Sequence, residues 1–431
     1  MNANIVSLKA RLTGKFAIDS VWLIVSTILI GFSGLLTITI ANDSYGVHGM
    51  GALMQAISIY TLWSTVGNLG IQTSAQKHAA QFSDHSDELA IILSSAFLAT
   101  ILTALTAICA IILLLQFFPG FLGLGRIAYM LPPFLLAIFF FSINKTINNF
   151  CAGLRLMRFH SSVKMARWTA IIIGLLILND SPLASAGLAF LVAEIIVFCI
   201  LVFRTRAYFS RTTRNLIRTH LYFGAKSVLG ELTVALNSTA PTLLVGSVLG
   251  NTAVGYFSYA ENFARSVLMV SSAMQKNFNP IFTKIWYGEH KSDVEPHIRK
   301  MFFIQLALLA PAFLLLCSGY YFYSLWFMGE SYLQQFNVLL AFFPAILLMF
   351  LFGPLYGFLI MTSHLNWNFF RAALFVSLNI GLTALFLPVF DIAGAAYALS
   401  LASLFNFIFF HLLYQHLLGL NLLAIIFGVK R

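Results

Sequence analysis

The chain has 431 residues, of which 60% are hydrophobic and only 9% are charged, and its mean hydropathy is +0.88. This composition excludes an ordinary soluble domain and is typical of a protein that crosses a membrane several times. The net charge of +11 does not require a nucleic-acid partner, because Lys and Arg also accumulate where membrane helices meet the cytosol. We therefore predict membrane lipids as partners and no nucleic acid.

The first segment, residues 1–15, is basic and carries Ile5, Leu8 and Leu12 at helical spacing. This pattern predicts an amphipathic helix on the cytoplasmic membrane surface. Beyond it, apolar stretches long enough to cross a bilayer recur along the chain and predict an all-α membrane protein with twelve transmembrane helices. The expected spans are 16–41, 45–72, 88–117, 127–152, 165–180, 183–204, 221–249, 253–275, 300–323, 332–361, 368–390 and 392–417.

The charge of the loops between these spans predicts their orientation. With the N-terminus in the cytoplasm, the inner segments, Arg167 and Arg371 included, hold nearly all Lys and Arg, and the outer loops hold only Arg126. Such a bias is the positive-inside pattern of multi-pass proteins. Both termini are therefore expected on the cytoplasmic side.

The two halves of the chain repeat each other. The stretch 40–46, IANDSYG, parallels 249–255, LGNTAVG, and Ala186-Gly187 parallels Ala393-Gly394. Six helices in each half make these parallel repeats, which in transporters usually surround a central site. We expect two six-helix bundles around a central cavity, with these limits: bundles at 16–204 and 221–417, a basic cytoplasmic linker at 205–220 and a tail at 418–431.

The sequence lacks the common nucleotide-binding, zinc-protease and serine-hydrolase motifs. It contains no G-x-x-x-x-G-K-[ST], no H-E-x-x-H and no G-x-S-x-G, and its four cysteines fall in apolar runs without paired spacing. We therefore expect no catalytic residue, no metal and no cofactor.

A charged pair lies near the middle of the predicted eighth helix. Glu261 and Arg265 are four residues apart, and a charge at that depth costs about 2.5–3.5 kcal/mol, so neither is expected to face lipid. One interpretation is a self-neutralising pair, because Glu four residues before Arg is the favoured order on a helix. The other is that Arg265 uses its planar fork to bind phosphate oxygens in a water-lined cavity.

Polar side chains also form stripes at helical spacing along four predicted helices. The stripes contain Asp19, Ser26 and Ser33; Ser142, Lys145 and Asn149; Ser227, Glu231 and Ser238; and Ser258, Glu261 and Arg265. They predict a shared aqueous cavity, with hydrogen bonding between packed helices as the alternative. Asp19, Glu231 and Glu261 are candidates for ion or proton coupling, or else partners of nearby cations. Glu194 has no polar companion at helical spacing and is not a candidate.

The segments 249–263, LGNTAVGYFSYAENF, 279–284, NPIFTK, and 70–79, GIQTSAQKHA, with the six-plus-six layout, resemble the bacterial polysaccharide or O-antigen repeat-unit flippases of the multidrug/oligosaccharidyl-lipid/polysaccharide (MOP) exporter superfamily. The resemblance implies transport of an undecaprenyl-pyrophosphate-linked oligosaccharide to the periplasmic leaflet of the inner membrane, through a cationic cavity between the halves. It also implies a polysaccharide polymerase and a chain-length regulator as partners.

A pyrophosphate headgroup gives a physical reason for buried cations. We expect Arg265 to contact it, followed by Lys145 and then Lys226, which alternatively extends toward the membrane surface. Two other functions stay open. One is a multidrug or cation antiporter of the same superfamily, which favours buried acids over buried bases. The other is a membrane enzyme that polymerises or ligates glycans.

Overall fold

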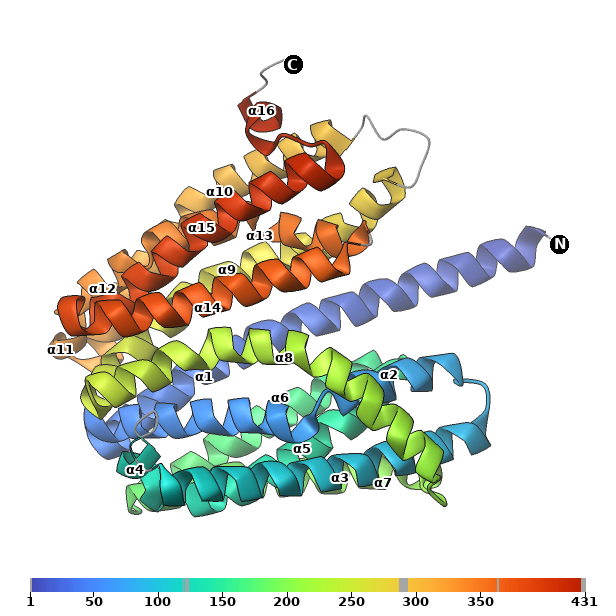
Figure 1. Cartoon of the computed structure of the whole chain (residues 1–431), viewed down its shortest axis with the longest axis horizontal. Helices are drawn as coiled ribbons and strands as arrows, with labels where there is room; N and C mark the ends of the chain where they lie inside the picture. The colour runs from blue at the N-terminus through green and yellow to red at the C-terminus, as the bar shows by residue number, and fades with distance from the viewer. Residues whose placement is uncertain (1, 119, 121–123, 287–293, 363, 428–431) are drawn as a thin grey trace. The chain divides into compact units, whose positions relative to one another are not determined.

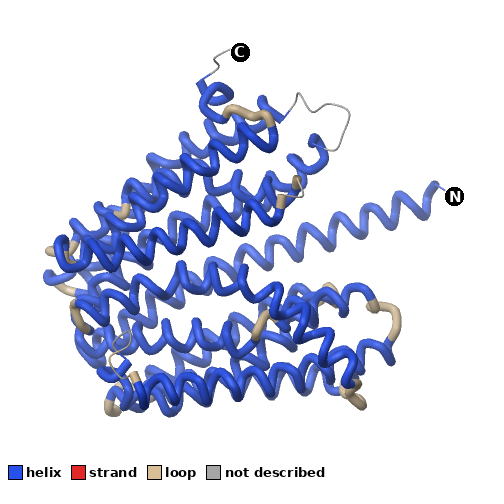
Figure 2. The backbone as a smooth tube through the Cα atoms, in the orientation of Figure 1, coloured by secondary structure: helices blue, strands red, loops and turns tan. Residues whose placement is uncertain are grey.

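All regular structure in the part of the chain that is described is helical, as predicted (Figures 1 and 2). The computed structural model describes residues 2–118, 120, 124–286, 294–362 and 364–427. For some of these the backbone alone is described, and residues 2–21 are the longest such stretch.

The chain divides into two compact units. Unit 1 comprises Met1–Gly49 and Leu53–Ala235, and unit 2 comprises Met50–Ala52 and Leu236–Arg431. The division falls inside one continuous helix, α8 (Arg214–Val248), just after the predicted linker. The limits of the two six-helix bundles remain predictions.

Unit 1 begins with a very long helix that contains one break. Gly46 has φ 66° and ψ 176°, outside the helical region, and it separates the first two predicted spans within α1. The helices of unit 1 are α1 (Asn2–Asn68), α2 (Ile71–Gln81), α3 (Ser86–Phe117), α4 (Leu124–Ile127), η2 (Ala128–Met130), α5 (Leu131–Gly153), α6 (Met157–Ile177), η3 (Leu183–Ser185), α7 (Ala186–Thr205), η4 (Arg206–Tyr208) and the first part of α8.

A tight junction joins α1 to α2. Leu69 and Gly70 have φ of 48° and 69°, a left-handed conformation that ends α1 and favours glycine. A Cβ on Gly70 would lie 2.4 Å from Ser227 Oγ and 2.6 Å from Gly224 O of α8. Only glycine therefore allows this close approach of α8 to the junction.

Helix α5 is central to the packing of unit 1, where it contacts α7, α2 and α3, and α6 packs along α7. Small and branched apolar residues line these contacts, among them Ala75, Ala79, Ile143 and Ile147, all with at most 1% exposure. Small side chains let membrane helices approach closely, which is how such bundles pack without a hydrophobic driving force between helices. This packing holds the polar face of α5 in a fixed position.

Unit 2 is built around the pairs α9 with α13 and α14 with α15. Its short segment from α1 is packed tightly, because a Cβ on Gly51 would lie 1.7 Å from the carbonyl oxygen of Asn251 at the start of α9. Its helices are the second part of α8, α9 (Asn251–Trp286), α10 (Val294–Tyr323), the π-helical turn η6 (Ser324–Met328), α11 (Glu330–Leu333), α12 (Phe336–Ala341), α13 (Phe343–Met361), α14 (Leu365–Phe390), α15 (Ile392–Leu418) and α16 (Leu422–Phe427).

Within the described ranges, eight helices are long and apolar enough to cross a membrane, and a ninth span results if the bent pair Glu330–Ala341 and Phe343–Leu359 is one crossing. The long helix α1 counts once in that number, although it covers two predicted spans. Two predicted spans, 165–180 and 253–275, are not among these eight or nine helices. They lie on α6 and α9, which are helical but carry several charged and polar residues. The multi-pass all-α fold is thus confirmed.

Candidate functional site

Unit 1 contains a polar cavity of about 510 Å³. Five helices contribute to its wall: α1, α2, α5, α6 and α7. The residues that line it are Ile30, Gln72, Phe141, Asn144, Lys145, Asn148, Asn149, Val163, Lys164, Arg167, Trp168, Glu194 and Val197. Among the described residues, three cations, one carboxylate, four side-chain amides and two aromatic rings thus line one space.

Lys145, a predicted phosphate contact, lies in this wall. Its Nζ donates to Ser64 Oγ at 2.9 Å and to Thr65 Oγ1 at 3.1 Å, and it lies 4.5 Å from the centre of the Phe141 ring. All of these partners are neutral, and among the described residues no carboxylate is within ion-pair distance of Lys145. Two hydroxyl groups and an aromatic ring therefore hold the Lys145 Nζ in place.

Arg167 is the second cation at the Phe141 ring. The guanidinium carbon lies 4.3 Å from the centre of that ring and 5.5 Å from the ring of Trp168. Its Nε is buried, has no hydrogen-bond partner in the described structure, and lies 3.9 Å from Glu194 Oε1. Aromatic stacking and a loose ion pair therefore position Arg167.

Glu194 is fully buried behind this arginine. Its carboxylate accepts hydrogen bonds from the Tyr60 hydroxyl and from Asn144 Nδ2, the latter at 2.7 Å. Neither Glu194 nor Arg167 was a sequence-based candidate, and these contacts show why. The partners of Glu194 come from α1, α5 and α6, whereas the sequence shows only the neighbours on its own helix. For Arg167, the 3- and 4-residue spacing of Lys164, Arg167 and Trp168 on one side of α6 was the available signal.

Glu231 lies in the same unit and is tied to α2. Its carboxylate accepts hydrogen bonds from Gln72 Nε2 at 2.7 Å and Thr73 Oγ1 at 2.6 Å. Asn149 Nδ2 in turn donates to Gln72 Oε1 at 3.2 Å, and this links Glu231 to the polar face of α5. The structure thus brings two predicted site residues, Lys145 and Glu231, into one connected polar region.

Lys226, a further predicted residue of unit 1, does not line this cavity. Lys226 is exposed, and its Nζ lies 4.1 Å from the centre of the Tyr222 ring, an arrangement that suits a lysine extended toward the membrane surface. Asp19 belongs to α1, but its side chain lies outside the described part of the structure.

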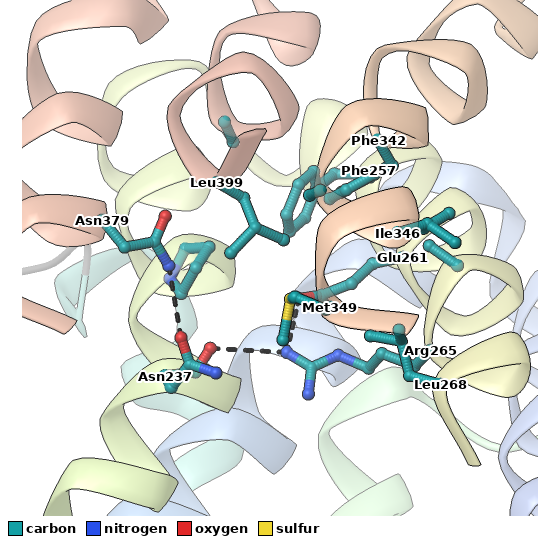
Figure 3. Close-up of a pocket in the computed structure, with 14 residues that line it drawn as sticks. Asn237, Phe257, Glu261, Arg265, Leu268, Phe342, Ile346, Met349, Asn379 and Leu399 are labelled. Atoms are coloured by element: carbon teal, nitrogen blue, oxygen red, sulfur yellow. Dashed lines mark hydrogen bonds and ion pairs between the residues drawn. The ribbon is translucent and has the colours of Figure 1, made fainter. Parts of the chain in front are cut away.

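Glu261 and Arg265 of unit 2 form an ion pair, as the first of the two interpretations of their spacing predicts. Arg265 Nη2 lies 2.6 Å from Glu261 Oε1 and donates to the carbonyl oxygen of Asn237 at 3.5 Å (Figure 3). It also donates to the carbonyl oxygen of Ser238 at 3.3 Å. In the described part of the chain, this guanidinium forms its hydrogen bonds through Nη2, and the Arg265 side chain is 39% exposed. Pairing with Glu261 therefore leaves part of the fork accessible.

The pocket next to this pair is small and mostly apolar, with a volume of about 50 Å³. Phe257, Met349 and Leu399 contribute to its wall, and Asn379 Nδ2 donates to Asn237 Oδ1 at 3.5 Å (Figure 3). In contrast to the unit 1 cavity, it has no room for a large headgroup.

The expectation that the polar stripes face water is wrong for three of their serines. Ser26, Ser142 and Ser258 are 2%, 0% and 3% exposed. Ser142 Oγ donates to the carbonyl oxygens of Ile138 and Ser64 at 2.8 and 3.3 Å, which is the hydrogen bonding between packed helices that the sequence left as the alternative. On α5 the water-facing part of the stripe begins at Lys145.

Comparison with known proteins identifies relatives of this fold. Residues 17–286 match the family model described as "Polysaccharide biosynthesis protein". A search of curated proteins found no match.

Three solved structures are similar over nearly the whole chain. The lipid II flippase MurJ in an inward closed conformation has a TM-score of 0.77 and 16% identity, covering 95% of this chain and 90% of that one. An inward-facing multidrug resistance MATE family transporter of the MOP superfamily has a TM-score of 0.72 and 12% identity, covering 93% and 96%. A MOP superfamily transporter from Pyrococcus furiosus with a reverse polarity of its binding pocket has a TM-score of 0.58 and 14% identity, covering 94% and 96%.

The MurJ and MATE structures share a fold of twelve helices in two repeats, which confirms the predicted fold class. The family model covers more than half of the sequence. The chain therefore belongs to the polysaccharide biosynthesis protein family and has the fold of the MOP superfamily transporters.

Proposed function

We propose that this protein is a flippase that moves an undecaprenyl-pyrophosphate-linked oligosaccharide repeat unit from the cytoplasmic to the periplasmic leaflet of the bacterial inner membrane. Transport proceeds by alternating access and is coupled to an ion or proton gradient. The observation that carries the proposal is the pair of cations, Lys145 and Arg167, held over one Phe141 ring in the wall of a polar cavity. Cations that lack full neutralisation by the protein suit a ligand that brings its own negative charge.

The remaining lining groups suit a saccharide. Side-chain amides such as Asn144, Asn148 and Asn149 donate and accept hydrogen bonds, as sugar hydroxyls require, and the Trp168 ring offers a face for stacking. Family membership and the likeness to a lipid II flippase support a lipid-linked glycan as the ligand. In this proposal the ligand is an O-antigen repeat unit for lipopolysaccharide, used on the outer side by a polymerase and a chain-length regulator.

Each predicted residue has a role in this scheme. Arg265, Lys145 and Lys226 bind phosphate oxygens at different stages of transport, and Asp19, Glu231 and Glu261 are the candidates for coupling. Both termini are cytoplasmic, as the distribution of Lys and Arg indicates.

A multidrug antiporter is the second candidate, because MATE transporters share the fold. Cationic drugs require acidic pockets. Among the described residues, the unit 1 cavity instead holds Lys145, Lys164 and Arg167 against the carboxylate of Glu194, so its charge favours an anionic ligand.

The test is a chromosomal deletion, followed by determination of the leaflet in which the lipid-linked repeat unit accumulates. Accumulation on the inner leaflet, reversed by the wild-type gene and not by Lys145→Met, supports translocation. Arg126→Gln, an exposed change at a predicted outer loop, is the matched control and should restore export. Unpolymerised units on the outer leaflet would instead indicate a polymerase, and sensitivity to cationic drugs with normal glycan would indicate an antiporter.

A further inference from the structure

Glu194 and Arg167 form an ion pair that is incomplete in a specific way. The closest approach is 3.9 Å between Oε1 and Nε, longer than a hydrogen bond, and Nε is buried without another partner among the described residues. The guanidinium meanwhile stacks on Phe141 at the cavity wall. Arg167 is thus placed between two possible anions: the Glu194 carboxylate behind it and an anionic group of a ligand in the cavity in front.

The surroundings of Glu194 determine the protonation state of its carboxylate when Arg167 binds a ligand instead. The charged and titratable groups that face this carboxylate are Tyr60 from α1, Lys145 from α5 and Arg167 from α6, with Lys164 of α6 in the same cavity wall. Lys145 is held by Ser64 and Thr65, and Tyr60 and Asn144 are neutral donors. Without Arg167, a carboxylate with no exposed surface keeps only neutral hydrogen-bond donors.

A buried carboxylate that loses its cation is strongly destabilised and is relieved by taking up a proton. We propose that Glu194 and Arg167 form an anion–proton co-binding site: an oxyanion of the ligand binds Arg167, and Glu194 takes up one proton from the aqueous phase as Arg167 leaves it. When the ligand departs, Arg167 returns to Glu194, and the proton is released to water. The oxyanion is either a phosphate or a sugar carboxylate, and its identity as part of a lipid-linked glycan rests on the proposed function.

Because the ligand and the proton are bound together, they bind cooperatively, and this cooperativity is reciprocal. The experiment uses the full-length purified protein and inorganic sulfate, an oxyanion that keeps its charge near neutral pH. Calorimetric titration in two buffers with different ionisation enthalpies measures the protons taken up per sulfate bound. We expect an uptake approaching one proton in the wild type, and sulfate affinity that falls as the pH rises.

Glu194→Gln mimics the protonated side chain. It should bind sulfate about tenfold more tightly than the wild type at neutral pH, within the roughly 5- to 150-fold range of coupled sites, without proton uptake and without pH dependence. Glu88→Gln is the control: Glu88 is an exposed acid in the first turn of α3 in the same unit, and its replacement should leave proton uptake as in the wild type. Titration with methyl glucuronide and with methyl phosphate then distinguishes a sugar carboxylate from a phosphate as the preferred anion.

Tyr60→Phe keeps the ring that stacks on Phe141 and removes one donor from the carboxylate. Protonation of Glu194 then persists to higher pH, and the loss of sulfate affinity should occur at higher pH than in the wild type. This variant serves as the test if Glu194→Gln fails to fold.

Three results would overturn the proposed co-binding: undiminished proton uptake in Glu194→Gln, an unchanged pH dependence in Tyr60→Phe, or no binding of sulfate to the wild type. None of them concerns glycan export. A deletion strain with normal surface glycan would instead refute the flippase function. It would not affect the co-binding of sulfate and a proton that is measured on the purified protein.

Discussion

Arg265 is bonded to Glu261 of its own helix at 2.6 Å, and yet it remains 39% exposed. The pair either only neutralises itself or restrains an arginine that binds phosphate. Arg265→Gln alone should abolish surface glycan in both cases, because it leaves Glu261 buried without its cation.

The double variant Glu261→Gln/Arg265→Gln separates the two roles. If the pair only neutralises itself, removal of both charges restores glycan export. We expect the double variant to remain inactive at normal protein abundance, because the phosphate-binding fork is missing. Quantified surface glycan and an immunoblot of the membrane fraction are the measurements, and recovery of export would remove Arg265 from the mechanism.

Phe141 positions two of the cations of the unit 1 cavity, Lys145 and Arg167, so its replacement should weaken anion binding without a loss of charge. Phe141→Leu keeps apolar bulk and removes two cation–π contacts worth about 0.5–1 kcal/mol each. We expect roughly 5- to 30-fold weaker sulfate binding by calorimetry. Phe140→Leu is the matched control, since Phe140 packs on Phe139 and Phe198. Equal affinities in the two variants would mean that the ring has no positioning role.

The junction between α1 and α2 should tolerate only glycine. Gly70→Ala introduces a Cβ at 2.4 Å from Ser227 Oγ into a left-handed backbone, and we expect it to lower the free energy of unfolding by about 2–4 kcal/mol. Gly230→Ala on α8 has open space around its Cβ and should be neutral or stabilising by up to about 1 kcal/mol. Thermal unfolding of the purified variants compares the two, and similar transitions would contradict the close approach.

Cysteine labelling tests where water enters unit 1. In a background without the native cysteines, Asn149→Cys at the cavity wall should react with a membrane-impermeant maleimide, and Ser142→Cys, two turns earlier on α5, should be protected. The rate of labelling in intact and permeabilised cells is the measurement. Rapid reaction at both positions would show that the packed end of α5 opens to water.

The fold could largely be predicted from the sequence, because the apolar stretches and the bias of Lys and Arg are properties of single helices and loops. Glu194 and Arg167 could not be predicted in the same way. Their partners Tyr60, Asn144 and Phe141 come from other helices, and a stripe on one helix does not show which neighbours meet it. Ser142 illustrates the opposite error, since helical spacing alone does not distinguish a serine that faces water from one that bonds to the next helix.

The contact between Gly51 and Asn251 has a consequence for biosynthesis. Gly51 leaves the ribosome 200 residues before Asn251, whose carbonyl oxygen fills the space where a side chain would be. At about 5–20 residues per second, translation separates the two by roughly 10–40 s. During that interval the early helix waits in the translocon or in lipid without its final neighbour, so the second unit closes only late in synthesis, and a nascent chain arrested before Asn251 should be a preferred target of membrane quality control.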